Sequence, residues 1–157
     1  MNLLWLFLPS LPVALWVAYS DLSTMKITNR AVLVMTAVFL VFGLIALPFD
    51  TYLWRLLQAV VILVVGFVIN ALRLVGGGDA KYAAAIAPFF AAADWRQVLL
   101  IFAVMLVAGY VTHRIAGKIP AITRATANWA SWEAGKHYPM GLSLSGTLIA
   151  YLLIALS

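Results

Sequence analysis

The chain has 157 residues, of which 66% are hydrophobic and only 10% are charged. A soluble domain is about half apolar and a quarter charged, so this composition excludes an ordinary soluble fold and predicts an integral membrane protein. The net charge of +5 then marks cytoplasmic loops rather than a nucleic-acid surface, and the lack of cysteine excludes disulfides, iron–sulfur clusters and cysteine-based zinc sites.

A membrane-spanning helix needs about 20 apolar residues, so the length allows about six spans and no separate soluble domain. We therefore expect an all-α fold, a polytopic membrane helix bundle whose single domain covers residues 1–157. Membrane lipid is the expected surrounding partner. No metal or cofactor is expected, because His113 and His137 are too few for a multi-histidine site. The sequence carries no signal of oligomeric state.

The first apolar run predicts a span over residues 2–20. A cleaved signal peptide is the alternative, because Ala18-Tyr19-Ser20 resembles a small-x-small cleavage site. A signal peptide begins with positive charge, and no Lys or Arg precedes this run, which favours the span.

The later apolar runs predict spans over residues 31–47, 52–75, 80–93, 98–112 and 138–154. Residues 21–30 form a polar connection, in which Thr28 or Asn29 can cap the next helix by accepting hydrogen bonds from free backbone amides. The span over 80–93 is short, because about 14 residues rise only about 21 Å against a roughly 30 Å hydrocarbon core. Pro88 is expected to kink it.

Three glycines, Gly76, Gly77 and Gly78, directly precede Asp79 and interrupt two long apolar runs. Three successive glycines cost backbone entropy and give a helix no packing surface, so we expect a loop that lets the backbone approach another molecule. Its free backbone groups can pair with an extended substrate strand. A flexible turn without further function is the alternative. No P-loop or G-x-G-x-x-G pattern is present.

Residues 113–137 form the longest polar stretch. Ile122, Ala125, Trp129 and Trp132 recur there at near-helical spacing, which is typical of an interfacial helix anchored by tryptophans. An ordinary loop is the alternative, because the periodicity is weak.

The lysines and arginines divide unequally between the two sides of a six-span topology. One side holds Lys26, Arg30, Arg73, Lys81, Arg114, Lys118, Arg124 and Lys136, and the other holds Arg55 and Arg96. Cytoplasmic loops are enriched in Lys and Arg, so both termini are expected outside the cytoplasm. The same division places Asp21 and Asp79 on the cytoplasmic side, and Asp50 and Asp94 on the other.

Two carboxylates at one membrane face predict a shared site if the first and fourth spans pack together. Asp21 and Asp79 would then share one proton, because two close carboxylates do not both ionise easily. One can take a proton from water while the other donates to a scissile carbonyl, which is the chemistry of aspartic proteases. The alternative for Asp21 is a charge that simply ends a span.

Two basic residues flank these carboxylates in the sequence, Lys26 and Lys81. They are read first as determinants of topology. The alternative is that one of them contacts an acidic residue of a substrate, in which case Lys26, Lys81 and the three glycines form the substrate-binding set around the catalytic pair.

Three motifs resemble those of the membrane aspartic peptidases that process type IV prepilins and archaeal preflagellins. Gly76-Gly77-Gly78-Asp79 is similar to the family's G-x-G-D signature. The stretch from Asp21 to Asn29 is similar to its D-x₅-I-P-N pattern, with Thr28 in place of proline, and Pro139-Met140-Gly141 is similar to its Pro-aromatic-Gly element, with Met140 in place of the aromatic residue.

The resemblance implies a prepilin peptidase in the bacterial inner membrane, with Asp21 and Asp79 as catalytic residues. The family cuts a short, basic, glycine-ended leader from a hydrophobic helix at the cytoplasmic face. The chain lacks the methyltransferase portion and the cysteine-pair segment of larger members. It therefore resembles the small, peptidase-only branch that serves Flp or tight-adherence pili (CpaA-like proteins), with periplasmic termini.

Three other functions stay open at this point. A small transporter or channel subunit would use Asp21 and Asp79 to relay a cation, and such carboxylates favour the middle of the membrane. A non-catalytic assembly factor of a secretion machine would have no activity. A presenilin-like or signal-peptide-peptidase-like protease also uses G-x-G-D, but with aspartates deeper in adjacent helices.

Overall fold

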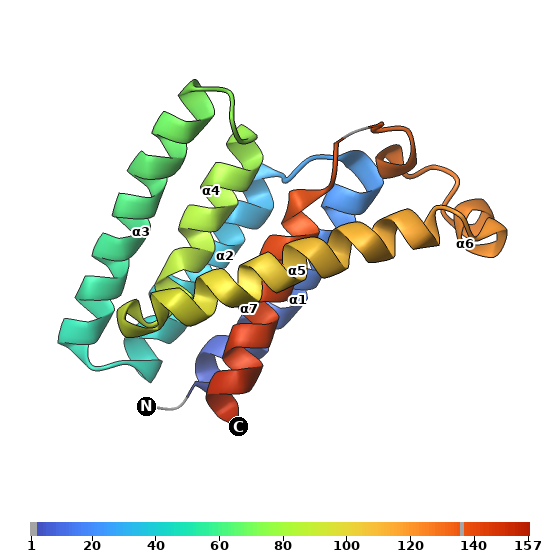
Figure 1. Ribbon diagram of the computed structural model, residues 1–157. Helices are drawn as coiled ribbons and strands as arrows, with labels where there is room; N and C mark the ends of the chain where they lie inside the picture. Colours follow the sequence, from blue (N-terminus) through green and yellow to red (C-terminus); the bar gives the residue numbers. More distant parts are fainter. Residues whose placement is uncertain (1–2, 136) are drawn as a thin grey trace.

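The computed structural model describes residues 3–135 and 137–157. The helices, in chain order, are α1 (Leu4–Thr24), α2 (Asn29–Ala46), α3 (Phe49–Ala71), α4 (Gly77–Ile86), the 3₁₀ turns η1 (Ala87–Phe89) and η2 (Ala92–Asp94), α5 (Trp95–Ala116), α6 (Pro120–Ala125), the 3₁₀ turn η3 (Ala130–Trp132) and α7 (Met140–Leu156). Within the described ranges every regular element is helical, so the predicted all-α bundle is confirmed (Figure 1).

Four helical stretches are long and apolar enough to cross a membrane, which makes this a multi-pass membrane protein. They are Leu4–Thr24, Asn29–Ala46, Phe49–Ala71 and Ala92–Ala116. The six expected segments correspond to α1, α2, α3, α4 with η1, α5 and α7. Helix α4 has only 10 residues and α7 has 17, so their crossing of the membrane stays a prediction. Asn2, where the first expected span begins, lies outside the described residues.

The bundle consists of two groups of helices that α2 connects. Helix α3 packs on α4, while α1 and α5 both pack on α7, and α2 contacts both α1 and α4. The buried core between them is aromatic and aliphatic. Phe39 of α2 meets Phe89 edge to face, with ring centroids 5.2 Å apart. This packing brings α1 and α4, which carry the two aspartates of interest, into the same bundle.

Helix α1 is longer than expected. It continues past Ser20 to Thr24, whose hydroxyl donates to the Ser20 carbonyl at 2.8 Å, and it ends where Met25 adopts a left-handed conformation with φ of 53°. The expected polar connection from residue 21 is therefore wrong at its start, and Asp21 lies in the last turn of the helix. The hydroxyl of Thr28 accepts from the Ala31 amide at 3.3 Å, which confirms the predicted cap of α2.

Proline interrupts the fourth segment, where a kink was expected. Helix α4 ends at Ile86, and Pro88 lies in the 3₁₀ turn that follows. The connection before α4 also lies earlier in the sequence than expected, because α3 ends at Ala71 and α4 already begins at Gly77. Between them, the side-chain amide of Asn70 donates to the Val75 carbonyl at 2.8 Å and stabilises the turn.

The polar stretch after α5 is mostly loop, as the second of the two alternatives predicted. Only Pro120–Ala125 forms an α-helix there, and the interfacial helix expected to continue through Trp132 is wrong. The reason is local packing, because Trp132 folds back and stacks on His113 of α5 with ring centroids 4.7 Å apart. Lys136, which was counted among the basic residues of this stretch, lies outside the described residues.

The connections alternate between the two ends of the bundle. Figure 1 shows the α1–α2 and α3–α4 connections and the stretch between α5 and α7 at its upper end, while both termini lie at the lower end. The last turn of α1 and the first turn of α4 therefore lie at the same end, as the division of charges predicted. The two helices do not pack extensively on each other, as had been expected of the first and fourth spans, but both contact α2 and α7.

Candidate active site

Asp21 is held in place by the first turn of α7. Its side chain is only 5% exposed, and its Oδ2 atom accepts a hydrogen bond of 2.7 Å from the backbone amide of Gly141. The amides of a helix's first turn have no partner within the helix, so a carboxylate is well suited to accept from one. This bond joins residues that are 120 positions apart in the sequence and fixes the orientation of the carboxyl group.

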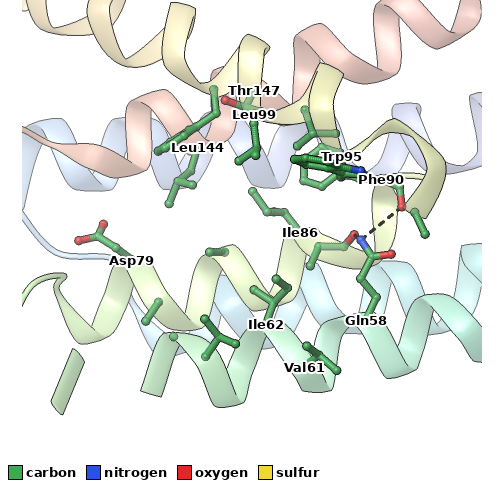
Figure 2. Close-up of a pocket in the computed structure, with 18 of the residues that line it drawn as sticks. Gln58, Val61, Ile62, Asp79, Ile86, Phe90, Trp95, Leu99, Leu144 and Thr147 are labelled. Carbon is green, nitrogen blue, oxygen red and sulfur yellow. Dashed lines mark hydrogen bonds between the residues drawn. The ribbon is translucent and has the colours of Figure 1, made fainter. Parts of the chain in front are cut away.

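Asp79 lies in the first turn of α4 and is half-buried. The positive end of the helix dipole favours a carboxylate at this position. It is one of the residues that line a pocket bordered by α3, α4, α5 and α7, and Figure 2 places it at one end of that pocket. Asp79 therefore borders open space, whereas Asp21 is enclosed.

The structure brings the two aspartates together. Their charges are close enough to interact. Ile27, in the turn after α1, lies next to two of the glycines in this region. Its backbone and Cβ are close to Gly78, and the end of its side chain is close to Gly141. Because Gly78 precedes Asp79 and Gly141 binds Asp21, one residue contacts the neighbours of both carboxylates.

Glycine is needed here for space rather than for backbone freedom. Gly76, Gly77 and Gly78 all have ordinary negative φ values, since Gly135 is the one glycine with positive φ among the described residues. A Cβ at Gly76 would lie 2.6 Å from Asp79 Oδ2, and a Cβ at Gly141 would lie 2.8 Å from Asp21 Oδ2. A side chain at either glycine would therefore crowd the carboxyl group beside it.

The two lysines considered as substrate contacts lie elsewhere. Lys81 is exposed, and its ammonium group donates to Asn29 Oδ1 at the start of α2, at 3.2 Å. The side chain of Lys26 is also exposed, in the turn between α1 and α2, where its carbonyl accepts from the Ser20 hydroxyl at 2.9 Å. Neither lysine lines the pocket that Asp79 faces.

Two contributors to this end of the bundle were not predicted. The Pro-x-Gly motif pointed to Gly141 but not to its hydrogen bond with Asp21. Tyr138 also lies close enough to Asp21 for the charge of that carboxylate to act on its hydroxyl group. Burial is the largest effect raising the pKa of Tyr138, the charge of Asp21 adds to it, and the hydrogen bond with Ser143 opposes both.

Residues 7–113 match the model of the type IV leader peptidase family. The match covers more than half of the chain and includes both aspartates, the three glycines and most of α1 through α5. No curated protein and no solved structure matches the chain significantly. A family of leader peptidases implies a protease that acts on type IV prepilins. The chain belongs to the type IV leader peptidase family.

Proposed function

We propose that this protein is an aspartic endopeptidase that removes the leader of Flp-type prepilins, with Asp21 and Asp79 as its catalytic pair. The observation that carries the proposal is that α1 and α4 bring these two carboxylates to one end of the bundle, close enough for their charges to interact. Gly76 and Gly141 leave each of them the space it occupies.

The chemistry requires one proton on the pair. The ionised carboxylate takes a proton from water as the water oxygen attacks the scissile carbonyl carbon, while the protonated partner donates to the carbonyl oxygen. In the second step the tetrahedral intermediate returns a proton to the donor, and the carbon–nitrogen bond breaks. The leaving nitrogen takes the proton that came from water. The pair again holds one proton, and no metal or cofactor takes part.

The two carboxylates have unequal surroundings, which supports a division of roles. Asp21 is enclosed and its Oδ2 is tethered to the Gly141 amide, so its position is fixed before substrate arrives. Asp79 lies at one end of the pocket and is the more accessible of the two to an incoming peptide. A preorganised carboxylate beside an accessible one suits a reaction in which geometry supplies much of the acceleration.

The proposed place of the reaction is the cytoplasmic face of the bacterial inner membrane, with both termini in the periplasm. The basic connections α1–α2 and α3–α4 lie at the aspartate end, and excess Lys and Arg marks the cytoplasmic side. A short basic leader reaches carboxylates at this depth without unwinding of the helix that follows it.

An ion relay is less well supported than the peptidase. A relay needs a polar path through the membrane, as well as carboxylates near its middle. Asp79 opens onto a pocket in which it is the one charged lining residue among those described, and the other polar side chains there are Gln58 and Thr147. Such a lining favours an apolar occupant over a cation.

The test is cleavage of a Flp-type prepilin co-expressed with the wild type, Asp21→Asn or Asp79→Asn, followed by its change in size. We expect cleavage by the wild type and by neither variant, with all three proteins inserted in the membrane. Failure of a well-inserted wild type to cleave several such prepilins would contradict the proposal, as would near-normal cleavage by either variant.

A further inference from the structure

An apolar groove leads away from Asp79 along the bundle. It has a volume of about 840 Å³, and its two walls are α3 with α4 on one side and α5 with α7 on the other. Figure 2 shows Asp79 at one end of the groove and Gln58 and Trp95 at the other. The groove therefore runs through the part of the bundle that the apolar helices place within the membrane.

The side chains of the groove define what can occupy it. Apart from Gln58, Asp79 and Thr147 they are apolar, and several remain accessible, including Val65 and Leu99 at 46% and 56% exposure. On α4 the half-buried lining residue Ala83 is small, and small residues let a second helix approach closely within a membrane, whereas Ala80 and Ala87 are already buried in the bundle. The occupant is apolar along its length and meets a carboxylate at one end.

The dimensions of the groove suit one face of a helix. Helix α3 lines it from Trp54 to Ile69, which is 16 residues. A helix of that length rises about 24 Å, which is about four turns. The groove is therefore long enough to seat one face of such a helix, while the opposite face is directed to lipid.

We propose that this groove binds the apolar helix that follows the cleaved bond of the prepilin, an inference that rests on the proposed function. A helix seated between α4 and α5 places its cytoplasmic end beside Asp79 and Asp21. Charge favours this occupant over a lipid, because the carboxylates attract a basic leader and repel the phosphate of an anionic lipid. Docking in the groove then sets which peptide bond reaches the carboxylates.

The lack of cysteine in this chain permits a direct test by disulfide crosslinking. Single variants Val65→Cys and Leu99→Cys place a thiol in the groove, one on each wall. Val64→Cys and Leu100→Cys are their matched controls, since each is adjacent on the same helix and similarly exposed, at 58% and 66%, but does not line the groove. Each is combined with Asp79→Asn, so that the substrate stays intact.

The probe is a Flp-type prepilin with one cysteine in its apolar helix, co-expressed with each variant and oxidised in membranes. We expect crosslinking to be several-fold higher at residues 65 and 99 than at residues 64 and 100. Equal crosslinking at groove and control positions overturns the proposal, and so does an absence of crosslinks at all four, the result expected if lipid fills the groove.

A parallel cleavage assay of the wild type separates this inference from the proposed function. Cleavage by the wild type without selective crosslinking would contradict binding of the prepilin helix in the groove but support the peptidase activity. Selective crosslinking without any cleavage by the wild type would support binding of the prepilin helix in the groove and contradict the peptidase activity.

Discussion

Asp79 and Asp94 lie toward opposite ends of the same groove, and the fold treats them differently. Asp94 immediately precedes α5 and accepts a hydrogen bond of 2.7 Å from the Tyr151 hydroxyl, which in turn accepts from the Ala91 amide at 2.9 Å. Asp79 lines the groove, and its charge interacts with that of a second carboxylate. Asp94 connects two helices, whereas we propose that Asp79 acts on the occupant of the groove.

The surroundings of Asp94 show why that end needs polar side chains. Pro88 interrupts the helix after α4 and leaves carbonyl groups without helical partners. Arg55 of α3, only 5% exposed, donates to the carbonyls of Phe89 at 2.9 Å and Pro88 at 3.3 Å, and Gln58 donates to Ala87 at 2.8 Å. We refer to Arg55, Gln58, Asp94 and Tyr151 as the Arg55 cluster.

The comparison teaches that a polar residue in a membrane bundle is not by itself a sign of catalysis. The Arg55 cluster satisfies backbone groups that a broken helix exposes, and so serves the fold. At the other end, glycines leave space beside two carboxylates whose charges interact, and we propose that this pair serves the reaction. The following predictions test this distinction.

The largest expected difference in turnover is between a variant of Asp79 and a variant of Asp94. Asp79→Asn is expected to lower the turnover of a prepilin by about 10³-fold, since it removes one member of a general acid–base pair. Asp94→Asn keeps an oxygen that can accept from Tyr151, so cleavage should stay close to that of the wild type. Turnover of purified protein in detergent measures both, and a similar loss in the two variants would contradict the comparison.

Crowding the enclosed carboxylate should also lower activity. A Cβ at residue 141 would lie 2.8 Å from Asp21 Oδ2 and 3.0 Å from Ile27 Cδ1, so Gly141→Ala displaces the carboxyl group. A displacement of about 1 Å is expected to lower turnover about 10²-fold. The control is Gly146→Ala on the same helix, where a Cβ would meet the flexible side chain of Met105 at 3.2 Å.

Fold stability should be unaffected by Gly146→Ala and little affected by Gly141→Ala, as judged by thermal unfolding in detergent. Equal turnover in the two glycine variants would show that space beside Asp21 does not matter for the reaction.

At the opposite end the expected effect is on stability. Arg55→Ala leaves the buried carbonyls of Pro88 and Phe89 without their donor, at a cost of about 1–3 kcal/mol. The variant should unfold at a lower temperature but cleave normally per folded molecule. Arg96→Ala is the control, because Arg96 is exposed and stacks over Trp95 at 5.3 Å. A loss of turnover with unchanged stability would place the Arg55 cluster in the reaction.

The smallest expected effect is that of a metal chelator. Among the described residues no group of three or more His, Asp or Glu side chains is arranged to hold a metal ion. We expect the cleavage rate to be the same with and without chelator. A loss of activity that added divalent metal restores would argue for a metal in the mechanism.

The fold was predictable from the sequence where the signal was local. Apolar run length gave the order of the helices, the positions of Lys and Arg put Asp21 and Asp79 at one end, and the Thr28 side chain gave the cap of α2. The end of α1 was misplaced, because Thr24 stabilises one further turn through the Ser20 carbonyl, a contact that apolarity does not reveal.

The rest depended on contacts between distant segments. The hydrogen bond from Gly141 to Asp21 joins the first and last long helices, and no local pattern encodes it. The three glycines were expected to form a loop that brings the backbone close to another molecule, but Gly77 and Gly78 begin α4, and Gly76 leaves space for the Asp79 carboxyl group. The groove arises from two pairs of helices, so it too was invisible in the sequence.

The most direct test of the central claim compares the single variants with their combination. Turnover of a prepilin is measured for purified wild type, Asp21→Asn, Asp79→Asn and the double variant. If the carboxylates act as one pair, each single substitution already removes the mechanism, and the double variant is no slower than either single. Losses that multiply in the double variant would contradict the account, because they would mean that the two aspartates act independently.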